Sequence, residues 1–166
     1  MGGDPSEIVK RQLGRKVKNF LRVVRWCSHG KPVVIESLPE KNGKPFPTLY
    51  WLTCPHLRRE VSRLEEKGLI RQFEERVKRD GAFREELLRA HEEVKRRRSE
   101  LVKTEWIREV LKRVGSGGIS DLAKVKCLHL HLADFLAGVN NPIGREVWNM
   151  IGEKECNDPP KECKEI

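Results

Sequence analysis

Residues 125–138, VKCLHLHLADFLAG, combine side chains that could do chemistry with an otherwise apolar segment. On a helical wheel, Cys127 and His131 are four residues apart and lie on one face together with Asp134. His129 lies within the apolar stripe, the position of a buried histidine that hydrogen-bonds to a backbone carbonyl. Thiolate and imidazole are ligands that zinc prefers. The spacing therefore predicts a metal site that includes Cys127 and His131.

Four further cysteines could complete such a site. Cys27 and Cys54 each follow a predicted strand, and a three-strand meander would bring both to one edge of the sheet, within about 10 Å. Cys54 also precedes Pro55 at a predicted helix N-terminus, where the helix dipole favours a thiolate. Cys156 and Cys163 lie in a polar tail that a metal could hold against the fold. Each cysteine could equally be a small buried residue.

The elements that must position these residues follow from periodicity and from Pro and Gly signals. We expect strands at 20–27, 33–38 and 48–54, and helices at 5–12, from Pro55 to Gly68, at 122–137 and at 142–151. The charged helical stretch 70–114 should break at Asp80-Gly81 and near Thr104. The sequence thus predicts an α+β fold, with a small N-terminal antiparallel sheet of about three strands followed by five or six helices. Residues 1–152 form one domain in this prediction, and 153–166 a tail pinned by metal.

Composition and charge narrow the classes of function. The 166 residues contain five cysteines, no run of about 18 apolar residues that could span a membrane, and no apolar leader segment. We therefore expect a cytoplasmic protein, in which cysteines bind metal or react as thiols rather than form disulfides. The net charge of +9 suits an anionic partner such as RNA, polyphosphate or an acidic protein. The candidate polyanion-binding residues are Arg11, Arg15, Lys16, Lys18, Arg22 and Arg25.

Several enzyme classes lack their signature motifs. The chain has no G-x-x-x-x-G-K-[ST] phosphate loop, no G-x-G-x-x-G, no H-E-x-x-H and no G-x-S-x-G. A conventional NTPase, dehydrogenase or serine hydrolase is therefore disfavoured.

Six segments of the chain form a specific set of motifs: RQLGR, CSHGKPVVI, PFPTLYWLTCPHL, RLEEKGLI, GGISDLAKVKCLHLHLADFLAG and NPIG. Between Gln12 and Gly144 they resemble the bacterial protein family catalogued as domain of unknown function 501, for which no activity is established. The resemblance implies functional positions at Cys27, Cys54, Cys127, His129 and one cysteine near the C-terminus, either Cys156 or Cys163. It favours His129 where the helical wheel favours His131, so both stay candidates.

Three hypotheses remain open. The first is a metal-binding structural or accessory protein, with zinc favoured by the Cys/His mixture and an iron–sulfur cluster as the alternative. The second is a thiol- or metal-dependent enzyme that uses Cys54 or Cys127 on a phosphorylated or nucleic-acid-derived substrate. The third is a basic protein that binds nucleic acid or polyphosphate.

Overall fold

The sheet is the antiparallel meander that the sequence predicts. In the computed structural model, which describes residues 3–164, strands β1 (Phe20–Trp26), β2 (Pro32–Ser37) and β5 (Tyr50–Leu52) are neighbours in that order. The register pairs Val23 with Ile35 and Val34 with Leu52. Because β2 lies between them, β1 and β5 run in the same direction and end at the same edge.

A second, two-stranded sheet interrupts the connection from β2 to β5. It consists of β3 (Glu40–Lys41) and β4 (Lys44–Pro45), which the sequence predicted only as a turn-rich loop. The two turn residues between them, Asn42 and Gly43, both have positive φ angles, which is the backbone of a tight hairpin turn.

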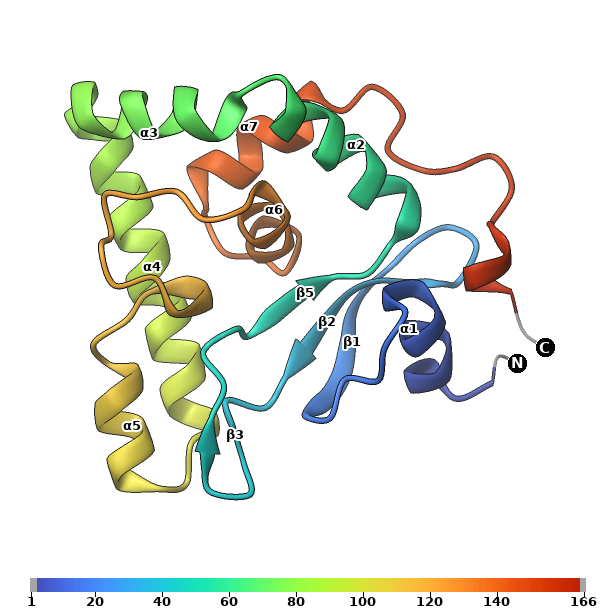
Figure 1. Ribbon diagram of the computed structural model, residues 1–166, viewed down its shortest axis with the longest axis horizontal. Helices are drawn as coiled ribbons and strands as arrows, with labels where there is room; N and C mark the ends of the chain where they lie inside the picture. Colours follow the sequence, from blue (N-terminus) through green and yellow to red (C-terminus); the bar gives the residue numbers. More distant parts are fainter. Residues whose placement is uncertain (1–2, 165–166) are drawn as a thin grey trace.

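Most of the helices lie on one side of the sheet, and the N-terminal helix lies on the other (Figure 1). The α+β class is confirmed, but the described residues contain seven α-helices rather than five or six. They are α1 (Pro5–Leu13), α2 (Pro55–Glu66), α3 (Leu69–Arg79), α4 (Gly81–Leu101), α5 (Glu105–Leu111), α6 (Leu128–Leu136) and α7 (Pro142–Met150), with short 3₁₀ helices η1 (Ser116–Gly118) and η2 (Lys161–Cys163).

Helix boundaries follow local signals in most places. Proline occupies the first position of α1, α2 and α7, where its missing N–H needs no partner. The predicted break at Asp80 is confirmed, since its side chain caps α4 by accepting a hydrogen bond from the Phe83 amide. The break at Thr104 is confirmed as well. The helix predicted at 122–137 is shorter, because it begins only at Leu128.

The core lies between the sheet and the helices. Its fully buried apolar side chains include Ile35, Leu49, Leu57, Leu87, Leu128, Leu132 and Ile143. Helix α6 packs against both β5 and α7. Gly144 allows the close approach of α6 and α7, because a Cβ at that position would lie 2.2 Å from the carbonyl oxygen of His131.

Arg98 is a buried cation whose guanidinium group forms hydrogen bonds with backbone carbonyl oxygens. It is 1% exposed, and its guanidinium donates hydrogen bonds to the carbonyl oxygens of Pro47, Leu111, Val114 and Gly115. This single side chain therefore joins α4, the end of α5 and the loop that precedes β5.

The C-terminal segment returns to the N-terminal part of the chain, where η2 packs against α1 (Figure 1). None of the helices within residues 3–164 combines the length and the apolar character needed to cross a membrane.

Candidate metal centre

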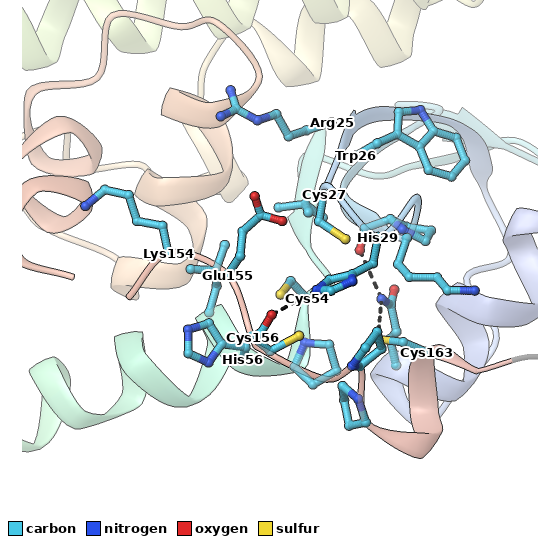
Figure 2. Close-up of a pocket in the computed structure, with 18 of the residues that line it drawn as sticks. Arg25, Trp26, Cys27, His29, Cys54, His56, Lys154, Glu155, Cys156 and Cys163 are labelled. Atoms are coloured by element: carbon cyan, nitrogen blue, oxygen red, sulfur yellow. Dashed lines mark hydrogen bonds between the residues drawn. The ribbon is translucent and has the colours of Figure 1, made fainter. Parts of the chain in front are cut away.

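Four of the five cysteines line one cavity of about 240 Å³. Cys27 follows β1, Cys54 immediately precedes α2, and Cys156 and Cys163 come from the C-terminal segment. Figure 2 shows their sulfur atoms gathered around the same space. Three segments that are distant in the sequence therefore contribute thiols to one site, and all five cysteines of the chain are free.

The meander places Cys27 and Cys54 at one edge of the sheet, as predicted. Cys27 sits in a tight turn, in which its amide donates to the carbonyl of Lys31 and its own carbonyl accepts from Gly30. Gly30 has a φ of 73°, a value that glycine adopts without strain. The amide of Cys54 bonds to the carbonyl of Val33 on β2 and so ties this cysteine to the sheet.

Polar contacts hold the C-terminal segment over this edge. A carboxylate oxygen of Glu155 accepts hydrogen bonds from the backbone amide of Ser28 at 2.7 Å and from its hydroxyl at 2.6 Å. The His29 ring lies 2.9 Å from the carbonyl oxygen of Cys156. The sequence predicted that a metal could pin this tail; these polar contacts also attach it to the domain. No local pattern in the sequence marks these pairs, which are 127 positions apart.

Basic residues outnumber acidic ones in the lining of the cavity. Arg25, Lys31 and Lys154 line it, with Glu155 as its one carboxylate within the described residues. Burial raises the pKa of the Cys54 thiol, even though the backbone amides at the start of α2 act in the opposite direction. The predicted helix-dipole effect at Cys54 is therefore present but weaker than desolvation.

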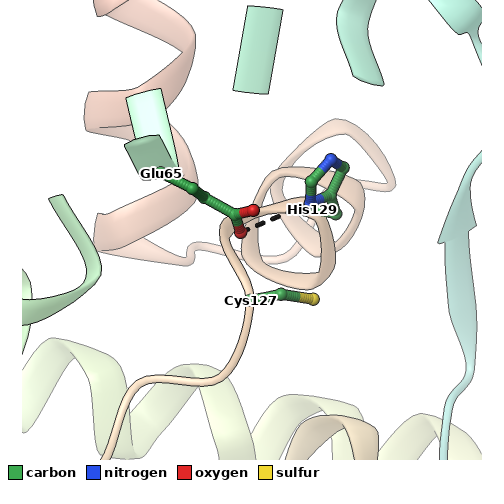
Figure 3. Close-up of side chains that lie close together, drawn as sticks. All are labelled: Glu65, Cys127 and His129. Atoms are coloured by element: carbon green, nitrogen blue, oxygen red, sulfur yellow. Dashed lines mark ion pairs between the residues drawn. The ribbon is translucent and has the colours of Figure 1, made fainter. Parts of the chain in front are cut away.

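A second group of ligand-type side chains lies away from this cavity. Glu65, Cys127 and His129 each offer one ligand atom, and these atoms all lie within 4.8 Å of one another (Figure 3). Within residues 3–164 no other such group of three or more histidine, cysteine or acidic side chains meets this distance. The four sulfurs of the cavity therefore do not all lie that close together.

Cys127 and His129 also influence each other's charge. Desolvation alone would raise the pKa of the Cys127 thiol, but its hydrogen bond with His129 lowers the pKa overall. Desolvation alone would lower the pKa of His129, but Cys127 and Glu65 raise it. Glu65 was missed by sequence reasoning, because it belongs to a helix in which charged residues alternate and nothing local marks it.

The burial that the helical wheel predicted for the two histidines differs from that in the structure. His131 is fully buried, with its Nδ1 atom 2.9 Å from the side-chain amide of Asn141, and burial beside His91 lowers its pKa to about 3. His129 is partly exposed and faces Cys127. The helical-wheel prediction placed Cys127 inside the helix. In the structure, the backbone of Cys127 is extended, and α6 begins at the next residue, Leu128.

The six predicted polyanion-binding residues have different neighbours. Arg11 donates to the carbonyl of Lys164, Arg15 stacks on Trp51, and Arg22 pairs with the buried Glu36. Arg25 lines the four-cysteine cavity. Only two of the six share a basic pocket, whose lysines are Lys16, Lys18, Lys41 and Lys44.

A comparison with protein families gives a match over most of the chain. The model of the family described as "Protein of unknown function (DUF501)" matches residues 23–149. No curated protein and no solved structure gave a significant match.

Proposed function

The chain belongs to the DUF501 family of proteins of unknown function, and we propose that it is a metal-binding protein whose four cavity cysteines hold an iron–sulfur cluster. The ligands in this proposal are Cys27, Cys54, Cys156 and Cys163. The observation that carries it is the convergence of four free thiols, from three separate segments, on one cavity. A cytoplasmic location, where thiols stay reduced, is part of the proposal.

The spacing of the sulfurs favours a cluster over a single zinc ion. Zinc holds four thiolates at about 2.3 Å in a tetrahedron, which brings all of them to within about 4 Å of one another. The four sulfurs here do not all lie within 4.8 Å of one another. A cluster spreads its thiolates over several iron atoms and so accepts wider spacing. The cavity of about 240 Å³ also exceeds what one ion requires. Zinc, which the Cys/His mixture favoured, becomes the alternative.

The residues around the thiols are suited to a negatively charged group such as a cluster. Four thiolates give a cluster net negative charge, and Arg25, Lys31 and Lys154 line the same cavity. The side-chain amide of Gln12 donates a hydrogen bond to the sulfur of Cys163. Hydrogen bonds to ligand sulfurs orient them and tune the potential of a cluster.

A centre with four protein thiolates has no position left for a substrate. It would join the end of β1, the start of α2 and the C-terminal segment, as a structural or electron-transfer centre. The enzyme hypothesis finds less support at this site for that reason.

The test uses the full chain purified without oxygen, with iron, sulfide and zinc measured per chain. We expect iron and sulfide in the protein, together with a broad absorption band at about 400 nm. Cys54→Ser and Cys163→Ser should abolish the band, whereas Cys127→Ser, the matched substitution outside the cavity, should retain it. Colourless protein from which Cys54→Ser and Cys163→Ser each remove one equivalent of zinc would identify zinc in the cavity instead. A chain with neither metal at these cysteines would overturn the proposal.

A further inference from the structure

We infer that Glu65, Cys127 and His129 form a second metal site, distinct from the four-cysteine cavity, that binds one zinc ion through three protein ligands. The donors are a carboxylate, a thiol and an imidazole, each of which zinc accepts. Their ligand atoms all lie within 4.8 Å of one another before any ion is bound. Little movement is therefore needed to bring them around one ion.

The position of Glu65 separates this site from the cavity. Glu65 follows Cys54 by eleven residues along α2, which corresponds to about 16 Å along the helix axis. Cys127 and His129 lie at the start of α6, and neither lines the four-cysteine cavity. The two sites share α2 but no ligand.

Hydrogen bonds orient two of the three ligands. Glu65 Oε2 accepts a hydrogen bond of 2.8 Å from the backbone amide of Leu128, at the N-terminus of α6, and lies 3.4 Å from His129 Nδ1 (Figure 3). His129 Nε2 is 3.2 Å from the carbonyl oxygen of Arg58. A metal-binding histidine generally donates its other N–H to such a carbonyl, which fixes the ring and leaves the first nitrogen free for the ion.

The charge of the ligands compensates the ion. A thiolate and a carboxylate together neutralise Zn²⁺. Three protein ligands leave a fourth tetrahedral position open, as in catalytic zinc sites, where water occupies it. Cys127 and His129 also line a pocket of about 320 Å³ together with Arg15, Arg58 and Lys126. The open position is thus accessible to small molecules, and the cations favour anionic ones.

The test measures zinc per chain after equilibration of the full-length protein with buffered zinc. Cys127→Ser and Glu65→Gln should each lose one equivalent of zinc while the iron content stays unchanged. Glu65→Gln keeps an oxygen that can accept the Leu128 amide, so its fold should persist. Cys54→Ser is the matched control, and it should keep this zinc even if the four-cysteine centre is lost.

Cobalt substitution provides an independent readout. Co²⁺ in this site should give a thiolate charge-transfer band with the intensity of a single sulfur ligand, absent in Cys127→Ser. A zinc content that is identical in the wild type, Cys127→Ser and Glu65→Gln would overturn the inference. So would a cobalt spectrum that Cys127→Ser leaves unchanged. Neither result bears on the iron of the four-cysteine cavity.

Discussion

The side-chain amide of Gln12 on α1 donates a hydrogen bond of 3.3 Å to the sulfur of Cys163, which lies 151 positions later in the chain. The same amide donates to the carbonyl oxygen of Pro32 at 3.0 Å. Both Gln12 and Cys163 are buried. One side chain thus connects the N-terminal helix, the start of β2 and the C-terminal segment at the border of the four-cysteine cavity.

Gln12→Leu should destabilise the protein by about 1–3 kcal/mol, because it preserves the size of the side chain but leaves the buried Pro32 carbonyl without this donor. Urea unfolding of the two proteins measures the difference. Gln72→Leu, the same change at an exposed position of α3, should have an effect below about 0.5 kcal/mol. Equal effects of the two variants would show that the Gln12 contacts do not stabilise the fold.

If the cavity holds a cluster, Gln12→Leu should also lower the reduction potential of that cluster, since a hydrogen bond to a ligand sulfur stabilises the reduced form.

Gly144→Ala should destabilise the protein by about 1–3 kcal/mol, the usual range for overpacking. The added Cβ would lie 2.2 Å from the carbonyl oxygen of His131 and would force α6 and α7 apart. Thermal unfolding followed by circular dichroism measures the loss. Gly81→Ala is the control, because a Cβ there meets its nearest neighbour, the Arg84 side chain, at an ordinary 3.7 Å. A Gly144→Ala protein as stable as Gly81→Ala would mean that the two helices adjust without strain.

Elements with strong local signals were predictable from the sequence. Pro55 and Gly68 mark the two ends of α2, and Asp80 marks the start of α4, because capping and backbone preferences act within a few residues. The meander then follows from three short strands with turns between them, and it places Cys27 and Cys54 at one edge. For these two cysteines, topology alone was sufficient to predict that they lie at the same edge of the sheet.

The rest of the candidate site depends on packing between distant segments. Residues 122–127 have the apolar content of a helix, yet they are irregular up to Cys127, and this shift changes which histidine faces that cysteine. Glu65 meets His129 across two helices, and Glu155 meets Ser28 across most of the chain. Periodicity describes one element at a time, so it cannot predict such pairs.

Arg98→Lys should destabilise the protein by about 2–4 kcal/mol, although it retains the charge. The guanidinium of Arg98 reaches four backbone carbonyls at once, whereas a lysine ammonium is a single point donor with three hydrogens. Burial already lowers the pKa of Arg98 to about 10, and lysine would meet the same desolvation. Chemical unfolding at neutral pH measures the effect. Arg89→Lys, on an exposed part of the same helix, should be nearly neutral. Comparable stability of the two lysine variants would contradict a structural role for the carbonyl contacts.

Asp134 is a carboxyl group kept in the core of the protein. It is fully buried on α6, and one of its oxygens accepts a hydrogen bond of 2.5 Å from the hydroxyl of Ser116. Burial raises its pKa from 3.8 to about 7, although Ser116 and the nearby Arg98 and Arg97 act in the opposite direction. The folded protein therefore keeps a proton that the unfolded chain releases, and the contribution of Asp134 to stability is greatest below pH 3.8 and is lost as the pH rises to about 7.

Asp134→Asn should remove this pH dependence, because asparagine does not titrate and its side-chain oxygen can still accept the Ser116 hydroxyl. The free energy of unfolding of the wild type, relative to that of Asp134→Asn, should fall by a few kcal/mol, on the order of 1.4 kcal/mol per pKa unit, as the pH rises from about 4 to about 7. The buried His91 and His131 titrate in both proteins, so their opposite effect on acid stability cancels in this difference. Urea unfolding of both proteins at several pH values across this range measures it. A difference that stays constant with pH would mean that Asp134 is ionised in the folded protein, with Arg98 and Ser116 compensating its burial.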